Sequence, residues 1–372
     1  MTDRGDDRIT VWYLIGRLSV GGTERTLVDL VNGLDQERFA PVVWTITEPG
    51  PLAADLDDDI PLRSLGAASK VDPRPPLRLA RALRRDRPTL LQSFLYFDNV
   101  LARLVGTISP ETTVVTGVRE VPDAIPRHRS IVDRVTLPLS DHIVSNSKAG
   151  AEWIIRRGAD PASVSVVKNG RDIDAYDVNA PAGLAEALGI DSGPVVGTVG
   201  RLVERKGHHD LLDAWPAVLK DHPHASLVIV GEGPERAALE AHAERLGISD
   251  SVHLLGRRGD VPELLDLFDV FVFPSHYEGL PGALIEAMAA GLPIVTTPVD
   301  GCAELIMDGE HGLHVPVRDS DRLAGTLIEI LEDPGRAEQL AAAAQRRARE
   351  QFTIGAMVEN TEALYGRLTD IE

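Results

Sequence analysis

The chain has one cysteine, Cys302, among its 372 residues. An intramolecular disulfide is therefore excluded, and this composition favours a reducing compartment. Cys302 follows Gly301 in an expected turn and has no His or second Cys beside it in the sequence. We expect its thiol to be inert.

Long apolar runs are also missing. The start of the chain has acidic flanks around an apolar run that is too short for a signal peptide. The longest weakly charged run, residues 279–299, is interrupted by proline and glycine and could not span a bilayer as a helix. We expect a cytoplasmic protein whose membrane contact, if it has any, is peripheral at the inner face of the cell membrane.

Basic residues are in short supply, and unevenly so. The sequence has 38 Lys and Arg against 57 Asp and Glu, a formal net charge of −19. Residues 1–170 carry 22 of each sign, whereas residues 171–372 carry 16 basic and 35 acidic side chains. An acidic half argues against nucleic acid as a partner. Any anion bound there needs specific local donors.

Apolar strand patterns alternate with helical patterns along most of the chain. This alternation is typical of parallel sheets covered by helices on both faces, and the length suggests two domains. The pattern weakens over residues 173–192 and then restarts. We predict two doubly wound α/β domains at 1–172 and 193–352, a linker at 173–192 and a terminal helix at 353–372. Ligands of such sheets bind beyond the carboxyl ends of the strands, so we expect the site between the two domains.

Two carboxylates mark the most informative segment, residues 271–297. A short apolar strand is followed by a loop with Glu278, a helix that contains Glu286, and another strand. The helix start offers free N–H groups and a partial positive charge to a ligand. The spacing alone fits a pair of hydroxyl-binding or acid–base carboxylates, and it fits equally a buried crossover in which both Glu residues are structural.

Two cations follow a strand of the second half. Gly200-Arg201 ends the strand at 195–199, and Lys206 comes five residues later. Arg can grip two oxygens of a diphosphate and Lys supplies a compact charge, so this pair favours a nucleoside diphosphate. Glu286 then suits a ribose diol and Glu278 suits sugar hydroxyls. The backbone N–H groups of Gly279, Leu280 and Gly282 suit a hydroxyl or a phosphate oxygen.

The first half offers weaker signals. Gly21-Gly22 stands in a strand-to-helix turn that could approach a phosphate, but it is not the dinucleotide-binding fingerprint. A basic helix is predicted near residues 76–87, with arginines on one face at Arg74, Arg78, Arg81 and Arg85. This face is either an ordinary solvated surface or a contact with anionic lipid headgroups.

Together the motifs resemble glycosyltransferase family 4, the retaining, nucleotide-sugar-dependent enzymes of the GT-B architecture. The resemblance covers nearly the whole chain and is carried, in order, by GGTERTLVDL, IVSNS, VKNG, GTVGRLVERKG, GEGPER, LLGRRGDVPELL and EGLPGALIEAMAAGLPIVTT. The two Glu residues at an eight-residue spacing, with R-x4-K upstream, are its most specific part. It implies two facing Rossmann-like domains, with the last helix crossing back onto the first.

The resemblance also implies residue roles. Arg201 and Lys206 would hold the donor diphosphate beside Gly200, Glu286 would bind the ribose, and Glu278 the donor sugar next to Gly279 and Leu280. Gly21 and Gly22 would meet the distal phosphate from the first domain, and Arg257, with Arg258, would lie near the base.

One departure from the family pattern concerns a histidine. Many relatives have a His in the loop after the fourth strand, where this chain has Phe94 and Phe97. Neither phenyl ring can exchange a proton. Arg119, at the end of the next strand, could take over part of the role of that His at the carboxyl edge of the first sheet. Arg119 and Asn99 are our candidates for the acceptor side of the site.

The expected function is therefore retaining, metal-independent transfer of a hexosyl group from a nucleotide sugar. Uridine is the expected base on family frequency alone, and guanosine remains open. The expected acceptor is a lipid-linked or polysaccharide glycoconjugate of the cell envelope. The cations would stabilise the leaving diphosphate, and the acceptor would attack the face that the diphosphate leaves. No cofactor is expected, because the nucleotide sugar is a substrate. A catalytically silent nucleotide-sugar-binding protein and a sugar-nucleotide epimerase of the same architecture remain alternatives.

Overall fold

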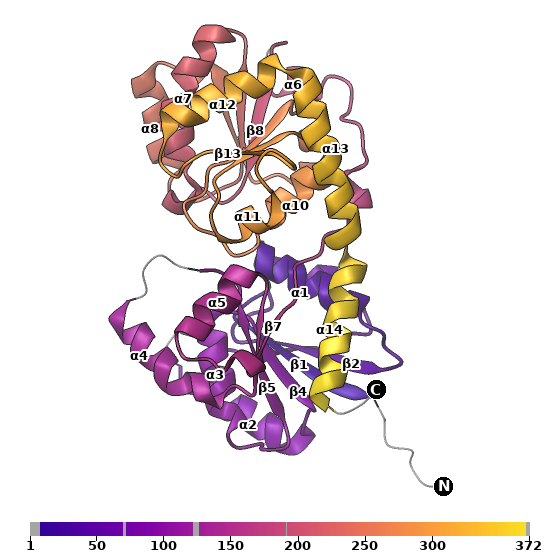
Figure 1. Ribbon diagram of the computed structural model, residues 1–372. Coiled ribbons are helices and arrows are strands. Elements are labelled where there is room, and N and C mark those ends of the chain that lie inside the picture. Colours follow the sequence, from indigo (N-terminus) through magenta and orange to yellow (C-terminus); the bar gives the residue numbers. More distant parts are fainter. Residues whose placement is uncertain (1–7, 70–71, 122–125, 191, 370–372) are drawn as a thin grey trace. The chain divides into compact units, whose positions relative to one another are not determined.

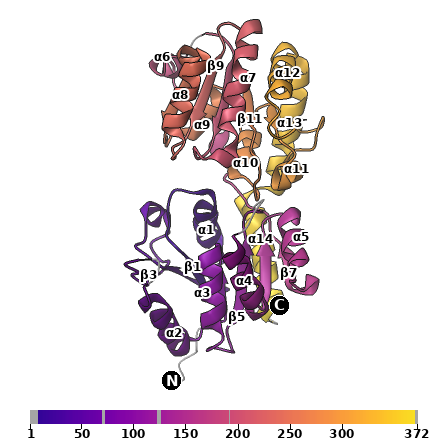
Figure 2. The ribbon, with the colours of Figure 1, turned by 90° about the vertical axis from the view of Figure 1, so that its left-hand side faces the viewer.

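The computed structural model describes residues 8–69, 72–121, 126–190 and 192–369. The chain forms two compact units, one made of Met1–Gly170 with Ile354–Glu372 and the other of Arg171–Thr353. Figures 1 and 2 show the helices of each unit flanking its sheet.

The first unit contains a seven-stranded sheet in the order β3-β2-β1-β4-β5-β6-β7, and all of its pairs are parallel. Its strands are β1 (Ile9–Ile15), β2 (Phe39–Thr45), β3 (Leu62–Ser64), β4 (Leu90–Ser93), β5 (Thr113–Val118), β6 (His142–Ser145) and β7 (Val164–Val166). Its helices are α1 (Gly22–Gly33), α2 (Arg74–Asp86), α3 (Tyr96–Gly106), α4 (Arg127–Thr136), α5 (Lys148–Arg156) and α14 (Ile354–Thr369), with short 3-10 turns η1 (Pro51–Asp55), η2 (Leu137–Leu139) and η3 (Pro161–Ser163).

The second unit contains a six-stranded parallel sheet in the order β10-β9-β8-β11-β12-β13. Its strands are β8 (Val195–Val199), β9 (Ser226–Val230), β10 (Val252–Gly256), β11 (Val270–Phe273), β12 (Ile294–Thr296) and β13 (Leu313–His314). Its helices are α6 (Leu184–Ala187), α7 (His208–Asp221), α8 (Arg236–Leu246), α9 (Val261–Asp266), α10 (Gly282–Ala289), α11 (Asp300–Leu305), α12 (Ser320–Glu332) and α13 (Pro334–Gln351), with 3-10 turns η4 (Asp174–Tyr176), η5 (Glu204–Lys206) and η6 (Ser249–Ser251).

The central strands are apolar on both faces because helices cover both faces. Six of the seven residues of β1 are buried, and so are all four of β11 and all five of β9. Continuous rather than alternating burial is the pattern of a doubly wound parallel sheet. The predicted fold class is confirmed.

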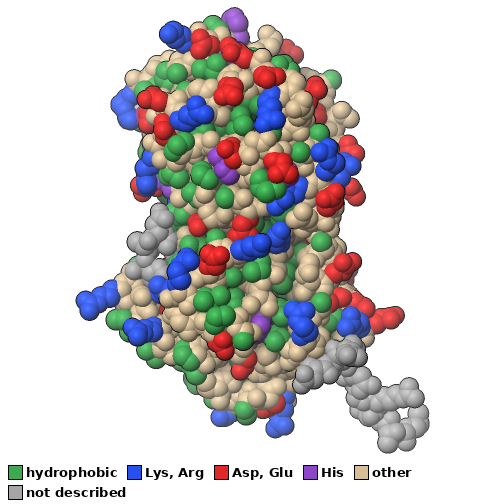
Figure 3. Space-filling view, viewed as in Figure 1, with side chains coloured by type: hydrophobic (Ala, Val, Ile, Leu, Met, Phe, Trp, Pro, Cys, Tyr) green, Lys and Arg blue, Asp and Glu red, His purple; other side chains and the backbone are tan. Residues whose placement is uncertain are grey.

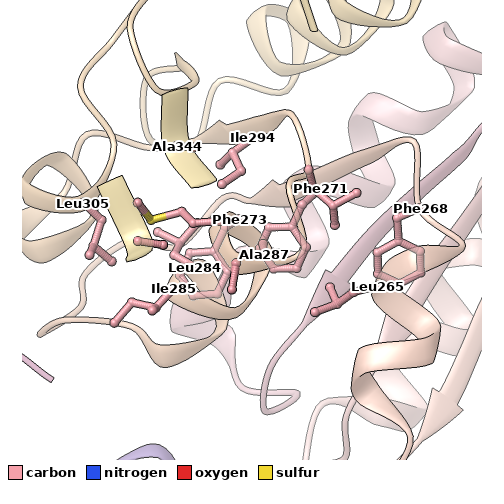
Figure 4. Packing of buried hydrophobic residues seen from close by; sticks show 14 of the residues in the cluster. Leu265, Phe268, Phe271, Phe273, Leu284, Ile285, Ala287, Ile294, Leu305 and Ala344 are labelled. Carbon is pink, nitrogen blue, oxygen red and sulfur yellow. The ribbon is translucent and has the colours of Figure 1, made fainter. Parts of the chain in front are cut away.

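A large apolar cluster fixes the segment that carries the two Glu residues. Phe271 and Phe273 of β11 pack with Leu284 and Ile285 of α10 on the α13 side of the sheet, as Figure 4 shows. Their aromatic rings stack with centroids 6.2 Å apart. The loop between β11 and α10 is therefore anchored at both ends in the core.

The expected linker is part of the second unit. Residues 173–192 contribute Ile173 and Ile190 to the same cluster, and η4 and α6 lie on it. These two side chains are 6% and 7% exposed, so burial of their apolar surface holds the segment against the unit. The division of the chain falls at Gly170 and Thr353.

The last helix belongs to the first unit, where α14 packs against α1 (Figure 1). The Tyr365 hydroxyl donates to Gln92 Oε1 at 2.6 Å and lies 3.0 Å from the Tyr13 hydroxyl. Burial raises the pKa of both tyrosines, so both hydroxyls are protonated at neutral pH. Residues 370–372 of the predicted terminal helix lie outside the described part of the chain. None of the helices in the described residues has the length and apolarity that crossing a membrane requires.

Replacing Tyr365 by Phe should destabilise the first unit by about 1–3 kcal/mol, because buried Gln92 and Tyr13 lose a hydrogen-bond partner. Urea unfolding followed by tryptophan fluorescence measures the change. Asn360→Ala, an exposed position on the same helix, should shift the free energy of unfolding by no more than about 0.5 kcal/mol. Equal stabilities of Tyr365→Phe and the unmodified protein would contradict the anchoring role.

Candidate functional site

Three loops meet at the carboxyl edge of the second sheet. They follow β8, β11 and β12, which are neighbours in the sheet. The first loop contains η5, the second joins β11 to α10, and the third leads into α11. Because parallel strands end at the same edge, this is where a doubly wound sheet binds ligands.

Glu278 is the centre of this edge. Its side chain is 6% exposed, and its Oε1 lies 2.7 Å from Lys206 Nζ. Arg205 Nη1 donates to Glu278 Oε2 at 3.3 Å and to the Tyr277 carbonyl at the same distance. A buried carboxylate requires such partners, since desolvation disfavours its charge. The sequence predicted Lys206 and Glu278 in one site, but it did not single out Arg205.

Lys206 is also fixed from other directions. Its ammonium lies 4.5 Å from the centroid of the Phe273 ring, at the end of β11. The η5 turn that carries it is tied to the next loop, because the His276 N–H donates to the Arg205 carbonyl at 2.7 Å. His276 Nε2 in turn lies 2.7 Å from the Asp210 carboxylate of α7. Both the backbone N–H and the ring Nε2 of His276 therefore have partners within the protein.

The loop with Glu278 also packs against the start of α11. The Glu278 N–H donates to the Asp300 carboxylate at 3.4 Å. A Cβ at Gly301 would stand 1.7 Å from the Gly279 carbonyl oxygen, so only glycine permits this approach. Cys302, the next residue, is buried, and burial raises the pKa of its thiol well above the ordinary value. The thiol is protonated at neutral pH, in agreement with its expected inertness.

Glu286 has a partner that the sequence did not indicate. Arg171 Nε donates to Glu286 Oε1 at 3.1 Å, and the Arg171 side chain is 5% exposed. The guanidinium lies against the first residue of α10, where a Cβ at Gly282 would stand 2.0 Å from Arg171 Nη2. Gly282 thus makes room for Arg171, and Arg171 orients Glu286, whose side chain keeps 19% exposure.

Two predicted cations of the second unit are exposed. No described residue forms an ion pair or side-chain hydrogen bond with Arg201 or Arg257. Gly200 lies beside the Lys206 stem, and a Cβ there would be 3.7 Å from Lys206 Cε. The structure therefore gathers Gly200, Lys206, Glu278, Gly279 and Leu280 at one edge. Arg201 follows Gly200 directly in the chain, with its guanidinium available to a ligand.

In the first unit the Gly21-Gly22 turn begins α1 without a side-chain cap from Gly21. The Glu24 carboxylate folds back over this turn, since a Cβ at Gly21 would lie 2.4 Å from Glu24 Oε2. A carboxylate near a helix N-terminus is favoured by the helix dipole. The Glu24 carboxylate therefore occupies the position beside Gly21.

Asp98 lies behind the same loop and was not predicted as a site residue. It is 2% exposed, and the backbone N–H groups of Gly16 and Leu95 donate to its carboxylate. Burial raises the pKa of the Asp98 carboxyl to about 7, although these two hydrogen bonds act in the opposite direction. Its Oδ2 has no hydrogen-bond partner among the described residues. An acid three residues after the N-cap Leu95 is a recognisable capping pattern, but sequence does not reveal burial.

The two acceptor-side candidates differ in their surroundings. The Asn99 side chain donates to the Gly117 carbonyl at 2.8 Å and accepts from the Ser93 hydroxyl at 2.8 Å, so it joins β4 to β5. Arg119 stacks over the Phe94 ring at 4.8 Å and donates to Asn169 Oδ1 at 3.2 Å. Burial lowers the pKa of the Arg119 guanidinium to about 10, and no described carboxylate pairs with it. Of the two phenylalanines that replace the expected His, Phe94 is buried in contact with Arg119, whereas Phe97 is 58% exposed.

Most of the predicted basic face of α2 is engaged by the chain. Arg74 pairs with Asp72, Arg85 pairs with Asp86, and Arg78 donates to the Leu65 carbonyl. Arg81 is exposed.

Two family profiles match the sequence of this chain. The family profile for glycosyl transferases group 1 matches residues 185–347, and that of Glycosyltransferase Family 4 matches residues 20–175. The chain belongs to these glycosyltransferases. The predicted family is confirmed, and the two profiles fall on the two units.

Two relatives illustrate the range of this glycosyltransferase family. A glycogen synthase of Mycobacterium tuberculosis is 31% identical over 252 residues, which cover 66% of this chain and 58% of the relative. The match thus spans little more than half of that protein's length. The lipopolysaccharide core biosynthesis glycosyltransferase LpsE of Rhizobium meliloti is 27% identical over 349 residues, covering 91% of this chain and 94% of LpsE.

A solved structure shows the same fold. The crystal structure of Anabaena HepE in complex with UDP and glucose has a TM-score of 0.85 at 22% identity. The alignment covers 97% of this glycosyltransferase and all of HepE. The expected GT-B architecture of two parallel-sheet α/β domains is confirmed.

The buried acid behind the first glycine-rich loop should make stability depend on pH. Because the folded-state pKa of Asp98 is raised, the folded protein binds more protons than the unfolded chain between about pH 4 and pH 7. Stability should therefore fall as pH rises through that window, by up to roughly 4 kcal/mol from this group. The variant Asp98→Asn should lack this pH-dependent contribution to the free energy of unfolding.

Urea unfolding of both proteins at pH 5 and pH 8 measures it. We expect the stability of the unmodified protein, relative to Asp98→Asn, to be lower at pH 8 than at pH 5. Two parallel pH profiles would show that Asp98 does not titrate in this window.

Proposed function

We propose that the protein transfers a hexosyl group from a nucleotide sugar to a glycoconjugate acceptor, with retention of the anomeric configuration and without a metal ion. The observation that carries this proposal is the buried Glu278 carboxylate held by Lys206 and Arg205, on the loop after β8 that also carries the exposed Arg201. Such an arrangement suits a ligand that has both hydroxyl groups and a diphosphate.

The cations would bind and stabilise the diphosphate. Arg201 has no competing carboxylate among the described residues, so its guanidinium can grip two phosphate oxygens. Lys206 is held in place by Phe273 and Glu278 before any ligand arrives. Charge that develops on the leaving diphosphate would meet donors that are already positioned, which is the most effective form of electrostatic stabilisation.

The carboxylates suit binding better than covalent catalysis. Two cations already hold Glu278, and an ion-paired carboxylate is a weak nucleophile. Its remaining acceptor capacity suits hydroxyl groups of the donor sugar. Arg171 holds Glu286 by a similar contact, and Glu286 would accept hydrogen bonds from the ribose diol. Retention would then follow from attack of the acceptor on the face that the diphosphate leaves, with a diphosphate oxygen taking the acceptor proton.

The donor base and the acceptor are inferred from chemistry shared with similar proteins. HepE was solved with UDP and glucose, and LpsE carries the name of a lipopolysaccharide core enzyme. We therefore propose a UDP-linked hexose as donor and a lipid-linked or polysaccharide acceptor.

Release of nucleoside diphosphate from a panel of UDP- and GDP-sugars, with and without acceptor extracts, tests the activity. Lys206→Ala should lower kcat/KM by about 10²–10³-fold, the usual cost of removing a group that stabilises developing charge. Lys206→Ala also leaves Glu278 with one cation fewer, so thermal unfolding must accompany the assay. Arg201→Ala, which breaks no described contact, should lower turnover by at least tenfold without a change in stability.

Lys220→Ala is the matched control, because this exposed lysine of α7 lies away from the edge and should leave turnover unchanged. Nucleotide-sugar binding without turnover for every donor and acceptor would favour a silent binding protein. Interconversion of donor sugars without acceptor would favour an epimerase.

The stereochemistry and the metal requirement form a separate test. The anomeric configuration of the product, read by NMR, should match that of the donor sugar. Turnover should survive EDTA, because Arg201 and Lys206 supply the positive charge that a divalent ion would otherwise supply. An inverted product, or loss of activity restored by added Mg²⁺ or Mn²⁺, would contradict the proposed mechanism.

A further inference from the structure

Exposed apolar side chains gather on one part of the first unit. Most large hydrophobic residues of the described chain are buried, but α3, α4 and η2 pack together and expose several. We call these residues the α3–α4 surface: Phe97, Leu104, Ile131, Val132, Val135 and Leu139. Contiguous exposed apolar side chains on a protein surface mark an interaction site more often than scattered ones do.

Helix α4 gives this surface its amphipathic character. Ile131 and Val135 are one turn apart and are 56% and 70% exposed. Arg127 and Arg134 fall on the same face at helical spacing, and both are exposed without a described partner. Figure 3 shows Lys and Arg side chains projecting at the edge where Figure 1 places α4, with hydrophobic side chains between them.

The single acid of α4 is turned away from this face. Asp133 Oδ1 lies 2.7 Å from Arg103 Nη1, and the Arg103 side chain is 3% exposed. Arg103 also donates to the Ser140 hydroxyl at 2.9 Å, so the pair belongs to the contact between α3 and α4. The outer face of α4 is consequently basic and apolar, without a carboxylate of its own.

A second contact fixes α4 on α3. The Arg129 guanidinium stacks over the Tyr96 ring at 5.3 Å and over the Phe97 ring at 5.2 Å. The Tyr96 hydroxyl donates to the Arg129 carbonyl at 3.3 Å. The α3–α4 surface is thus preformed.

We propose that the α3–α4 surface binds an anionic lipid bilayer. Helices that lie in the membrane interface combine an apolar face with basic residues, as this surface does. Arg127 and Arg134 complement anionic headgroups, while Ile131 and Val135 enter the boundary between headgroups and acyl chains. The bilayer contact itself is independent of transfer, and only its role in bringing a lipid-linked acceptor to the enzyme rests on the proposed function.

Helix α2, which the sequence suggested for this contact, is the less suitable surface. Three of its four arginines on the predicted face already have partners within the chain. Its exposed apolar side chain is Leu77 alone among the large hydrophobic residues of the helix. The α3–α4 surface has more exposed apolar side chains and leaves Arg127 and Arg134 unpaired.

Co-sedimentation with vesicles tests the proposal. The full chain should bind vesicles of phosphatidylcholine with phosphatidylglycerol and bind phosphatidylcholine alone at least tenfold more weakly. Val135→Asp and the double variant Arg127→Glu/Arg134→Glu should each reduce binding at least tenfold, since each basic residue near an anionic surface contributes about fivefold. Raising the salt concentration should weaken binding of the unmodified protein.

Matched variants on α2 give the control. Leu77→Asp and Arg81→Glu, both at exposed positions, should bind vesicles as the unmodified protein does. Circular dichroism and thermal unfolding should be unchanged in all variants, because none of the substituted side chains is buried. Lys206→Ala should bind vesicles normally, so failure of membrane binding and failure of transferase activity are distinguishable.

Three results would overturn the proposal. One is absence of binding to anionic vesicles, and another is an equal loss of binding in the α2 variants. The third is a concentration-dependent dimer in sedimentation that Val135→Asp abolishes, which would identify the surface as a contact between two copies of the chain.

Discussion

Burial of the Glu278 carboxylate is the constraint on which the ligand edge of the second unit depends. A carboxylate removed from water is strongly disfavoured unless cations and hydrogen bonds replace its hydration. Lys206 and Arg205 supply that replacement, and both come from the η5 turn after β8. The need to neutralise one charge therefore brings the loop after β8 to the loop after β11. The close approach of Gly301 to Gly279 adds the segment after β12.

The same constraint explains why an acidic unit can present cations to a ligand. The second half has 16 basic against 35 acidic residues, so its mean charge repels anions. Fixed local donors can overcome this repulsion where cations outnumber the carboxylates that hold them. Lys206 and Arg205 share the one carboxylate of Glu278, so it offsets only part of their positive charge. Arg201 has no carboxylate partner among the described residues. In the first unit the opposite problem arises, because Asp98 is buried against backbone N–H groups without a cation, and its pKa rises.

Sequence patterns gave reliable predictions wherever the physical signal was local. Apolar strand runs, helix starts and the glycine positions all act over a few residues, so the alternation of strands and helices and the fold class followed from them. The family followed from the resemblance of short motif strings, which are also local. Lys206 and Glu278 were predicted together because their strands end at the same edge. Predictions were weaker where a charge meets a partner far along the chain. Arg171 lies 115 residues from Glu286, and nothing near either residue indicates the pair.

The sequence by itself determined the two parallel-sheet domains, the membership in a glycosyltransferase family and the candidate ligand edge, because periodicity and motif spacing encode them directly. Only the tertiary structure decided which side chains are free to act. Packing engaged three of the four arginines on the predicted face of α2, joined Asn99 to β5 and placed Ile173 and Ile190 of the expected linker in the core of the second unit. It also turned Asp133 of α4 inward to Arg103, leaving a basic and apolar outer face. The reason is physical: burial and ion pairing depend on which distant segments pack together, and local sequence carries no record of that packing.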